Sequence, residues 1–256
     1  MTLLVEQFIC RSDNYGVLIH DTETRQTASI DAPEYAPIAE KLKEKGWRLD
    51  TILVTHHHAD HVEGNLALKK EFGCTIIGPA GEADRIPGID KAVKGGDTFR
   101  FGSYEVKVLD TPGHTSGHIS YWLPSAGIAF VADTLFAIGC GRILEGTPEM
   151  MWDSLEKIAA LPDNTSVYVG HEYTLANARF ALSVDPGNPD LVTRADEVAR
   201  LRDAGKMTLP TTIALEKRTN PFLRARDPAI RQRLGMQDSP DAAVFGELRR
   251  RKDSFR

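Results

Sequence analysis

The sequence is poor in cysteine. Its three cysteines, Cys10, Cys74 and Cys140, lie far apart, form no Cys-x-x-Cys pair and cannot all be joined to one another by disulfides. We therefore expect a protein of the reducing cytoplasm. Long apolar runs are also missing, because the most apolar stretch, residues 127–141, is interrupted by Asp133, and residues 1–13 lack a basic start followed by an apolar run. We expect neither export nor a membrane-spanning segment.

A uniform charge is missing as well. Residues 173–256 hold 16 Lys and Arg against 11 Asp and Glu, whereas the remainder holds 15 against 25, so a basic tail follows an acidic part. The basic run at residues 249–252 is typical of a solvated helix face, but it also suits a clamp for an anion. Because the sequence shows no basic stripe interleaved with aromatic residues and no zinc-finger spacing, we favour a small anionic substrate over nucleic acid.

What the sequence does contain is an alternation of strand-like and helix-like segments up to about residue 170, and mostly helical segments from Tyr173 onward. A chain of 256 residues is long enough for one large domain with a smaller one attached. We predict a first domain over residues 1–172 and a helical domain over residues 173–256 with three or four helices. Helices are predicted at residues 37–45, 61–72 and 148–160, and strands at 14–19, 27–31, 51–55, 75–78, 98–101, 104–109, 119–123, 128–132 and 166–169.

The most informative segment reads Thr-His-His-His-Ala-Asp-His and follows the strand predicted at residues 51–55. If the extended backbone continues, His56 and His58 point to one side and His57 to the other, so His57 is not expected to be a ligand. Asp60 and His61 fall where the chain turns into the next helix. This cluster supplies more imidazole and carboxylate than one tetrahedral ion can use, which suggests two neighbouring ions.

Three later segments also place a ligand-type residue just after a strand, namely His114, Asp133 and His171. Loops at the ends of neighbouring strands usually meet along one edge of a sheet. Five histidines and two aspartates serve two ions if one carboxylate bridges them, and each ion then keeps room for water. Because these seven ligands suffice, we expect His118 to support the site without binding metal.

These motifs resemble the metallo-β-lactamase superfamily: the Thr-His-x-His-x-Asp-His run, Thr-Pro-Gly-His114, the strand-terminal Asp133 and Gly-His171-Glu-Tyr173. Their order and spacing are most similar to the glyoxalase II family, the hydroxyacylglutathione hydrolases. Features outside the ligands carry this closer resemblance: Cys140-Gly-Arg142, Pro210-Thr-Thr, Asn220-Pro-Phe-Leu-Arg224 and the basic terminal run. The resemblance implies an α/β fold, a four-layer αβ/βα sandwich of two mixed sheets flanked by helices, followed by a small all-helical domain that binds substrate.

The resemblance also implies the site residues. One ion is expected on His56, His58 and His114, the second on Asp60, His61 and His171, with Asp133 bridging. Glutathione contacts are implied for Arg142, Tyr173, Arg249 and Lys252. Arg142 stands where better-known members have lysine, which keeps the charge but changes the donor geometry. Leu144 stands where those members have tyrosine, so one hydroxyl contact to the peptide is missing.

By this resemblance the protein hydrolyses S-(2-hydroxyacyl)glutathione thioesters, typically S-D-lactoylglutathione, to glutathione and D-lactate, the second step of methylglyoxal detoxification. A hydroxide that bridges the ions is the expected nucleophile, with Asp60 and Asp133 as the catalytic carboxylates that hold the ions in place. We expect zinc, with iron or manganese as other ions that the same ligands accept. We also expect a monomer.

Three alternatives stay open at this stage. A related persulfide dioxygenase uses one iron and part of this ligand set, and a lactamase or RNA-processing nuclease of the same superfamily would share the motifs of the first domain. A non-catalytic module stabilised by metal belongs to a different class. Structural sites are usually closed by four protein ligands, so the room left for water favours an enzyme.

Overall fold

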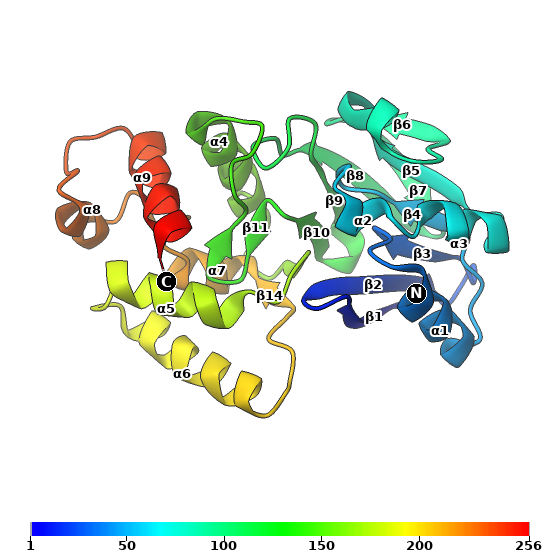
Figure 1. The fold of residues 1–256 in the computed structure, drawn as a ribbon, viewed down its shortest axis with the longest axis horizontal. Helices are drawn as coiled ribbons and strands as arrows, with labels where there is room; N and C mark the ends of the chain where they lie inside the picture. Colours follow the sequence, from blue (N-terminus) through cyan, green and yellow to red (C-terminus); the bar gives the residue numbers. More distant parts are fainter. Residues whose placement is uncertain (1, 256) are drawn as a thin grey trace. The chain divides into compact units, whose positions relative to one another are not determined.

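The structure is a computed structural model that describes residues 2–255. The chain forms two compact units (Figure 1). The first contains the chain up to Asp110 together with Ser116–Phe130, and the second contains Thr111–Thr115 together with the chain from Val131 onward. The two units are therefore interleaved along the sequence, and each is described separately below.

The first unit is built on a six-stranded mixed sheet with the order β1-β2-β3-β4-β5-β6. Strands β1 to β3 are antiparallel neighbours and β3 to β6 are parallel. The sheet's strands are β1 (Leu3–Cys10), β2 (Asn14–Asp21), β3 (Thr27–Ile30), β4 (Thr51–Leu53), β5 (Thr75–Pro79) and β6 (Lys91–Val93). Parallel strands need long crossover connections, and helices supply the first two of these. They are α1 (Tyr35–Lys45), which links β3 to β4, and α2 (Ala59–Val62) with α3 (Asn65–Phe72), which link β4 to β5; a 3-10 turn, Ala80–Arg85, follows β5.

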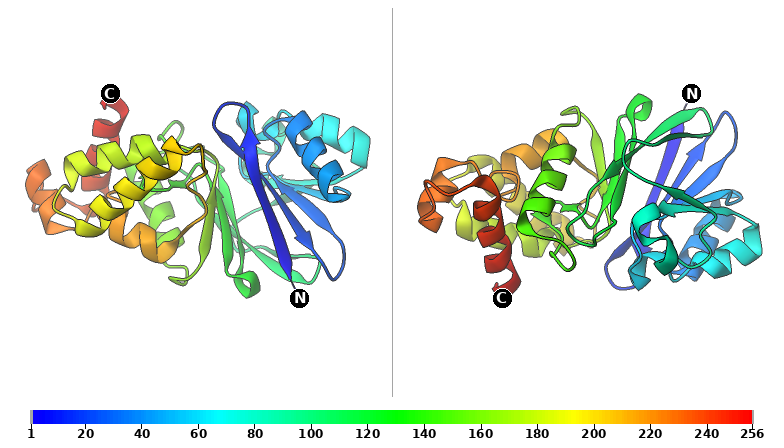
Figure 2. Two further views of the ribbon diagram at one scale, coloured as in Figure 1. Left: turned by 90° about the horizontal axis from the view of Figure 1, so that it is seen from below. Right: turned by 90° about the horizontal axis from the view of Figure 1, so that it is seen from above.

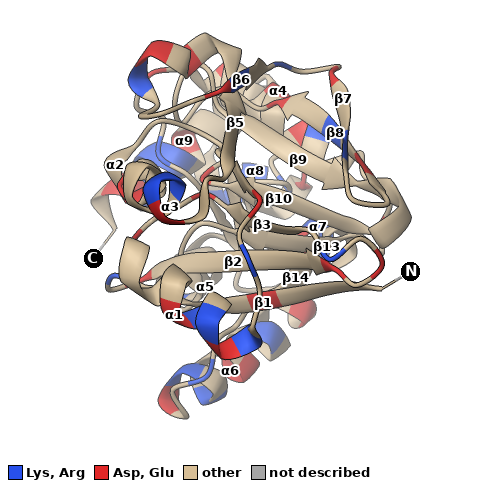
Figure 3. Cartoon of the chain, turned by 90° about the vertical axis from the view of Figure 1, so that its right-hand side faces the viewer, with Lys and Arg blue, Asp and Glu red and all other residues tan. Residues whose placement is uncertain are grey.

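A hydrophobic cluster joins these helices to the sheet. Ile38 and Leu42 of α1 and Leu68 of α3 are fully buried with apolar side chains of β2, β4 and β5. Charged positions lie on α1 and α3, whereas β2 and β3 are almost free of them (Figure 3). The helices thus bury one apolar face on the sheet and turn a charged face to solvent, as amphipathic helices do.

The same unit contains antiparallel strands in the order β10-β9-β8-β7. They are β7 (Thr98–Phe101), β8 (Tyr104–Asp110), β9 (Ile119–Leu123) and the start of β10 (Ile128–Ala132), with a 3-10 turn at Pro124–Ala126 between the last two. Tyr121 of β9 is fully buried, and its hydroxyl donates to the carbonyl of Val54, 2.7 Å away, directly after β4. This hydrogen bond ties the antiparallel strands to the first sheet across the core of the unit.

The second unit is mainly helical. Its strands are short: β11 (Leu135–Phe136) pairs with β12 (Gly139–Cys140), and β13 (Ser166–Val169) pairs with β14 (Thr211–Thr212). Its helices are α4 (Pro148–Ala159), α5 (Thr174–Val184), α6 (Pro189–Asp203), α7 (Ile213–Thr219), α8 (Pro228–Leu234) and α9 (Asp241–Ser254). Helices α5 and α6 lie side by side (Figure 2) and share a hydrophobic cluster that contains Ile138 and Leu191. Among residues 2–255 no helix combines the length and apolarity needed to cross a bilayer.

The predicted elements agree with the structure except at a few places. The strands predicted at 98–101, 119–123, 128–132 and 166–169 have the observed bounds, and α1 ends at Lys45 as predicted, followed by the C-cap Gly46 with a left-handed φ of 67°. The prediction of one helix over 61–72 is wrong, because the chain forms α2 and α3 with Gly64 between them. The Gly64 amide donates to the Ala32 carbonyl at 2.9 Å, and a Cβ on Gly64 would lie 3.1 Å from that oxygen. Between Tyr173 and Phe255 the structure has five helices instead of the predicted three or four.

Candidate metal centre

Asp31 organises residues 55–61, called the ligand loop of the first unit because they carry the metal ligands predicted there. It directly follows β3, and its carboxylate accepts hydrogen bonds from the Thr55 amide at 2.7 Å and the Thr55 hydroxyl at 2.8 Å. The same carboxylate lies 2.7 Å from Nδ1 of His61. Because β3 and β4 are parallel neighbours, the residues that follow them meet at one edge of the sheet. Asp31 therefore fixes both ends of the segment that carries the predicted ligands.

His56 and His58 converge as the sequence predicts. Nε2 of His56 lies 3.1 Å from Nδ1 of His58, and Nδ1 of His56 lies 3.0 Å from the Thr55 hydroxyl. His57 turns the other way, since its amide donates to Glu82 at 2.8 Å and its Nδ1 lies 2.7 Å from the same carboxylate. The prediction that His57 faces away from its neighbours is confirmed.

Asp60 and His61 lie at the start of α2. Oδ2 of Asp60 lies 3.7 Å from Nε2 of His61 and accepts a hydrogen bond from the Asn14 side-chain amide at 3.0 Å. Asn14 also donates to the Asp60 carbonyl at 3.1 Å, so it holds both the backbone and the side chain of that residue. His118 is fully buried and stacks on His56, with ring centroids 4.9 Å apart, where it can fix the orientation of that ring.

The second unit brings the other three predicted ligands together. Oδ2 of Asp133 lies 3.5 Å from Nε2 of His114 and 3.3 Å from Nε2 of His171, and all three residues are at least nine-tenths buried. Nδ1 of His114 lies 2.8 Å from the Arg142 carbonyl. A Cβ on Gly141 would lie 1.8 Å from the Asp133 carbonyl, so only glycine allows the chain to pass this close to Asp133.

These contacts fit metal ligation. The Arg142 carbonyl can only accept, so His114 must carry its proton on Nδ1, which leaves Nε2 as the nitrogen with a lone pair. The Asp31 carboxylate selects the same tautomer of His61. Outer partners of this kind orient metal-binding histidines and raise their basicity. Each unit thus supplies imidazole and carboxylate donors, a set that suits zinc, iron and manganese.

Sequence reasoning missed three residues that shape the first unit's loop, namely Asn14, Asp31 and Glu82. The sequence predicts Asp31 as the last residue of a strand over 27–31, but the strand ends at Ile30 and Asp31 has a left-handed φ of 56°. An aspartate directly after a strand, in a neighbour of the ligand-bearing strand, was the signal available in the sequence. Nothing local to Asn14 or Glu82 links them to the ligand loop, because both act over long sequence separations.

The residues predicted to contact glutathione all belong to the second unit. Tyr173 stacks on His171 with ring centroids 4.8 Å apart and an interplanar angle of 2°, and it remains 39% exposed. The Arg142 side chain is 69% exposed, and its Nε lies 3.7 Å from Oδ1 of Asp253. Arg249 is buried and donates to the Cys140 carbonyl at 2.7 Å and to Asp253 at 2.9 Å. Burial, together with the charge of Arg249, lowers the pKa of Lys252.

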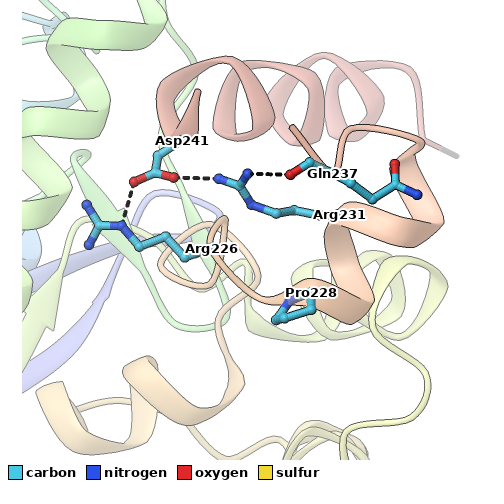
Figure 4. A pocket seen from close by; sticks show the side chains of 5 residues that line it. All are labelled: Arg226, Pro228, Arg231, Gln237 and Asp241. Atoms are coloured by element: carbon cyan, nitrogen blue, oxygen red, sulfur yellow. Dashed lines mark hydrogen bonds and ion pairs between the residues drawn. The ribbon is translucent and has the colours of Figure 1, made fainter. Parts of the chain in front are cut away.

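A separate cavity of about 430 Å³ lies beside α8 and α9, lined by Arg226, Pro228, Arg231, Gln237 and Asp241 (Figure 4). Both arginines pair with Asp241, and Arg231 also donates to the Gln237 carbonyl. Their charges are therefore engaged within the protein. None of the predicted ligand or glutathione-binding residues lines this cavity.

Comparison with known families first defines the class. Residues 21–171 match the model of the metallo-β-lactamase superfamily, and residues 172–255 match the model described as the hydroxyacylglutathione hydrolase C-terminus. Together with the mixed sheets, the helices and the histidine and aspartate donors, these matches place the chain in the metallo-β-lactamase superfamily. Its metallo-β-lactamase domain is followed by a helical C-terminal domain. The predicted fold class is confirmed. Membership of this family and the donor set indicate two divalent ions.

Individual relatives then narrow the assignment. The chain is 62% identical over 253 residues to the hydroxyacylglutathione hydrolases of Brucella anthropi and Brucella abortus, covering 99% of this chain and 97% or 98% of theirs. Among solved structures, ETHE1 from Myxococcus xanthus is 29% identical with a TM-score of 0.67, covering 94% of each chain. A metallo-β-lactamase from Staphylococcus aureus is 22% identical with a TM-score of 0.66, covering 97% of this chain and 71% of the other. The chain belongs to the hydroxyacylglutathione hydrolase family, also called glyoxalase II, which confirms the family predicted from the sequence.

Proposed function

We propose that this protein hydrolyses S-(2-hydroxyacyl)glutathione thioesters, with S-D-lactoylglutathione as the reference substrate, to glutathione and a 2-hydroxy acid. The observation that carries the proposal is the 62% identity to hydroxyacylglutathione hydrolases over 99% of the chain. It extends through residues 172–255, the part that matches the C-terminal model of the same enzymes. The reaction would complete methylglyoxal detoxification by releasing D-lactate.

The proposed ligand sets are those implied by the family resemblance. His56, His58 and His114 hold one ion, Asp60, His61 and His171 hold the other, and Asp133 serves both. The position of Asp133 between two histidines of its own unit supports the bridging role. Zinc is the proposed native ion, and iron or manganese would satisfy the same donors.

Two divalent ions held by these residues would lower the pKa of water from ~15.7 toward about 7 and so would supply hydroxide at neutral pH. The protein's contribution is to hold the donor atoms in place before substrate arrives. Asp31 and the Arg142 carbonyl hold the rings of His61 and His114 in the ligating tautomer, and Asn14 holds Asp60. The metal-ligating atoms are then already in place, so no rearrangement is needed when negative charge develops on the thioester oxygen. The chemistry therefore requires no serine, cysteine or lysine nucleophile.

For substrate binding we propose Arg142, Tyr173, Arg249 and Lys252. Glutathione carries two carboxylates, and three cations of the second unit suit an anion of this kind. Arg142 is the most exposed of the three, and its guanidinium group can form a bidentate ion pair with a carboxylate. Leu144 is 57% exposed and offers no hydroxyl, so affinity rests more heavily on Arg142 and Tyr173.

We also propose that the metal-binding domain covers residues 1–172 and the substrate domain residues 173–256. The two family models meet between residues 171 and 172, which supports this boundary. We further propose that the protein is a monomer located in the cytoplasm. Sedimentation of the purified protein and fractionation of the source cells test these two points.

Thiol release from S-D-lactoylglutathione, measured before and after chelation with metal counted in the same samples, tests the function. Rapid release that requires about two ions per chain is the expected result. The matched substrate is the lactoyl thioester of 2-mercaptoethanol, which has no glutathione carboxylates and should react with a much higher KM. Tight binding of two ions without release from either thioester would contradict the proposal.

A further inference from the structure

The hairpin β11-β12 of the second unit has a strained turn. Its register pairs Phe136 with Gly139, so Ala137 and Ile138 form a two-residue loop. Ile138 has a φ of 56°, in the left-handed region that β-branched residues avoid. Its side chain is fully buried in the cluster formed with α5 and α6, which explains why isoleucine stands where glycine would relieve the backbone. Strain of this kind persists only where the surroundings hold the backbone in place.

Side chains from two helices hold this turn. The Ile138 amide donates to Oε2 of Glu216 at 2.9 Å, and the Asn177 side chain donates to the Ala137 carbonyl at 3.1 Å. Asn220 donates to the carbonyls of Phe136 at 3.2 Å and Gly139 at 2.9 Å. Four backbone polar groups of the hairpin are therefore bound by side chains of α5, of α7 and of Asn220, which directly follows α7.

Glu216 is the centre of this arrangement, and it is fully buried. Its Oε1 accepts from Arg194 of α6 and, at 2.7 Å, from the Thr211 hydroxyl. Its Oε2 accepts from the Ile138 amide and from Asn220 at 2.9 Å. Thr211 and Asn220 belong to the two motifs, Pro210-Thr-Thr and Asn220-Pro-Phe-Leu-Arg224, that mark the family in the sequence but have no place in the chemistry described above. Both motifs converge on this one carboxylate.

The hairpin carries residues next to the proposed substrate site. The ring of Phe136 lies edge-on to His171 and Tyr173, with centroid separations of 5.9 and 5.4 Å. At the other end, the Cys140 carbonyl accepts from Arg249 at 2.7 Å, and Arg142 follows two residues later. A shift of the turn would therefore move the Phe136 ring beside Tyr173, the Cys140 carbonyl that binds Arg249, and the nearby residue Arg142.

We propose that Glu216 is a positioning residue for the glutathione part of the substrate: by binding the Ile138 amide and Asn220, it fixes the β11-β12 hairpin and, through it, Tyr173, Arg142 and Arg249. This inference rests on the proposed function. It predicts that loss of Glu216 weakens substrate binding much more than it slows the chemical step.

The test compares Glu216→Gln with Asp185→Asn. A glutamine offers one oxygen, so either the Ile138 and Asn220 donors or the Arg194 and Thr211 donors face an NH2 group. Asp185 is a second buried carboxylate of the same unit, and it pairs with Asn188 and Arg224. For Glu216→Gln we expect the KM for S-D-lactoylglutathione to rise at least tenfold, with kcat per metal-loaded chain within threefold and two ions per chain retained. For Asp185→Asn we expect lower thermal stability and an unchanged KM.

Amide hydrogen exchange of residues 135–142 in the same proteins reports on the hairpin without any substrate. Faster exchange in Glu216→Gln, but not in Asp185→Asn, supports the inference. Unchanged exchange, or a fall in kcat with KM unchanged, overturns it. If Glu216→Gln does not fold, Asn177→Ala removes only the bond to Ala137 and should raise KM about threefold. Wild-type protein that releases no thiol would instead reject the proposed function, while the exchange result still decides whether Glu216 holds the hairpin.

Discussion

Asp31 and His61 are joined by a contact of 2.7 Å between a carboxylate oxygen and Nδ1, within one buried corner of the first unit. The same carboxylate also binds the amide and hydroxyl of Thr55. One acidic side chain therefore sets the tautomer of a proposed ligand and the start of the loop that carries the others. Partners of this kind affect metal affinity although they do not touch the ion.

We expect Asp31→Asn to lower metal affinity or activity about 10- to 100-fold, because the amide cannot hold the His61 ring as the carboxylate does. Metal content after dialysis against a weak chelator, followed by thiol release, measures the effect. Asp50→Asn is the matched control, since the Asp50 carboxylate accepts the Thr27 amide at 2.9 Å and Asp50 precedes β4, whereas the proposed ligands follow that strand. Equal metal retention by the two variants would contradict the role given to Asp31.

Gly141→Ala should disable the ligands proposed in the second unit without changing a charged group. The added methyl group would lie 1.8 Å from the Asp133 carbonyl, so the backbone of Asp133 or Gly141 must move. We expect about 2 kcal/mol or more of destabilisation, typical of overpacking, and loss of metal. Gly187→Ala is the control, because a Cβ there meets no atom within 4 Å. Urea unfolding and metal analysis of both variants decide between a local effect and a general intolerance of alanine.

The proposed ligands could be predicted from the sequence because the patterns that indicate them are local. His56, His58, Asp60 and His61 lie within one short segment of the sequence, and the alternation of side chains along an extended backbone separates His57 from its neighbours. The strand-terminal positions of Asp133 and His171 follow from the apolar runs before them. By contrast, the partners that hold these residues are distant in sequence: Asn14 reaches Asp60 across 46 residues and Glu82 reaches His57 across 25.

The elements that the sequence does not predict share a physical reason: no local pattern in the sequence marks them. Strand β1 lies at the edge of its sheet with only its last residue, Cys10, buried, so its sequence lacks the alternation that identifies a half-buried strand. β6 has three residues and β11, β12 and β14 have two each, too few for a period to be visible. The break at Gly64 depends on the approach of Ala32, which no local pattern contains.

Asp21 should make stability depend on acid. Burial raises its pKa, but hydrogen bonds from the amides of Ser103 and Glu23 and the hydroxyls of Thr24 and Ser103 outweigh burial, so its pKa falls from 3.8 to about 2. A carboxylate with a lowered pKa stabilises the fold fully above its unfolded value, and this stabilisation, about 2 kcal/mol at most, is lost as the pH falls from 3.8 toward 2. Comparison of wild type with Asp21→Asn by urea unfolding across this range tests the prediction. A difference independent of pH would contradict it.

Cys140 should be unreactive at neutral pH in spite of its place beside Arg249. Burial raises the pKa of its thiol to about 11, and the neighbouring arginine only partly opposes this. Thiolate, the reactive form, is therefore scarce below pH 9. Labelling of the native protein with iodoacetamide at pH 7.5 should leave Cys140 unmodified and thiol release unchanged, whereas labelling in urea should modify all three cysteines. Inactivation of the native protein by modification at Cys140 would show that the thiol is accessible and ionised.

Arg142 and Arg249 should differ although both are proposed to bind glutathione. The Arg142 side chain is 69% exposed, so Arg142→Gln should raise the KM about tenfold with little change in thermal stability. Arg249 is buried and binds the Cys140 carbonyl, so Arg249→Met should raise the KM and also cost about 2 kcal/mol in the free energy of unfolding. Arg250→Gln is the control for charge alone, since Arg250 is exposed and pairs with Glu247 on the same helix. If Arg250→Gln raised the KM as much as Arg142→Gln, the cations would act through net charge, and the specific contact proposed for Arg142 would be wrong.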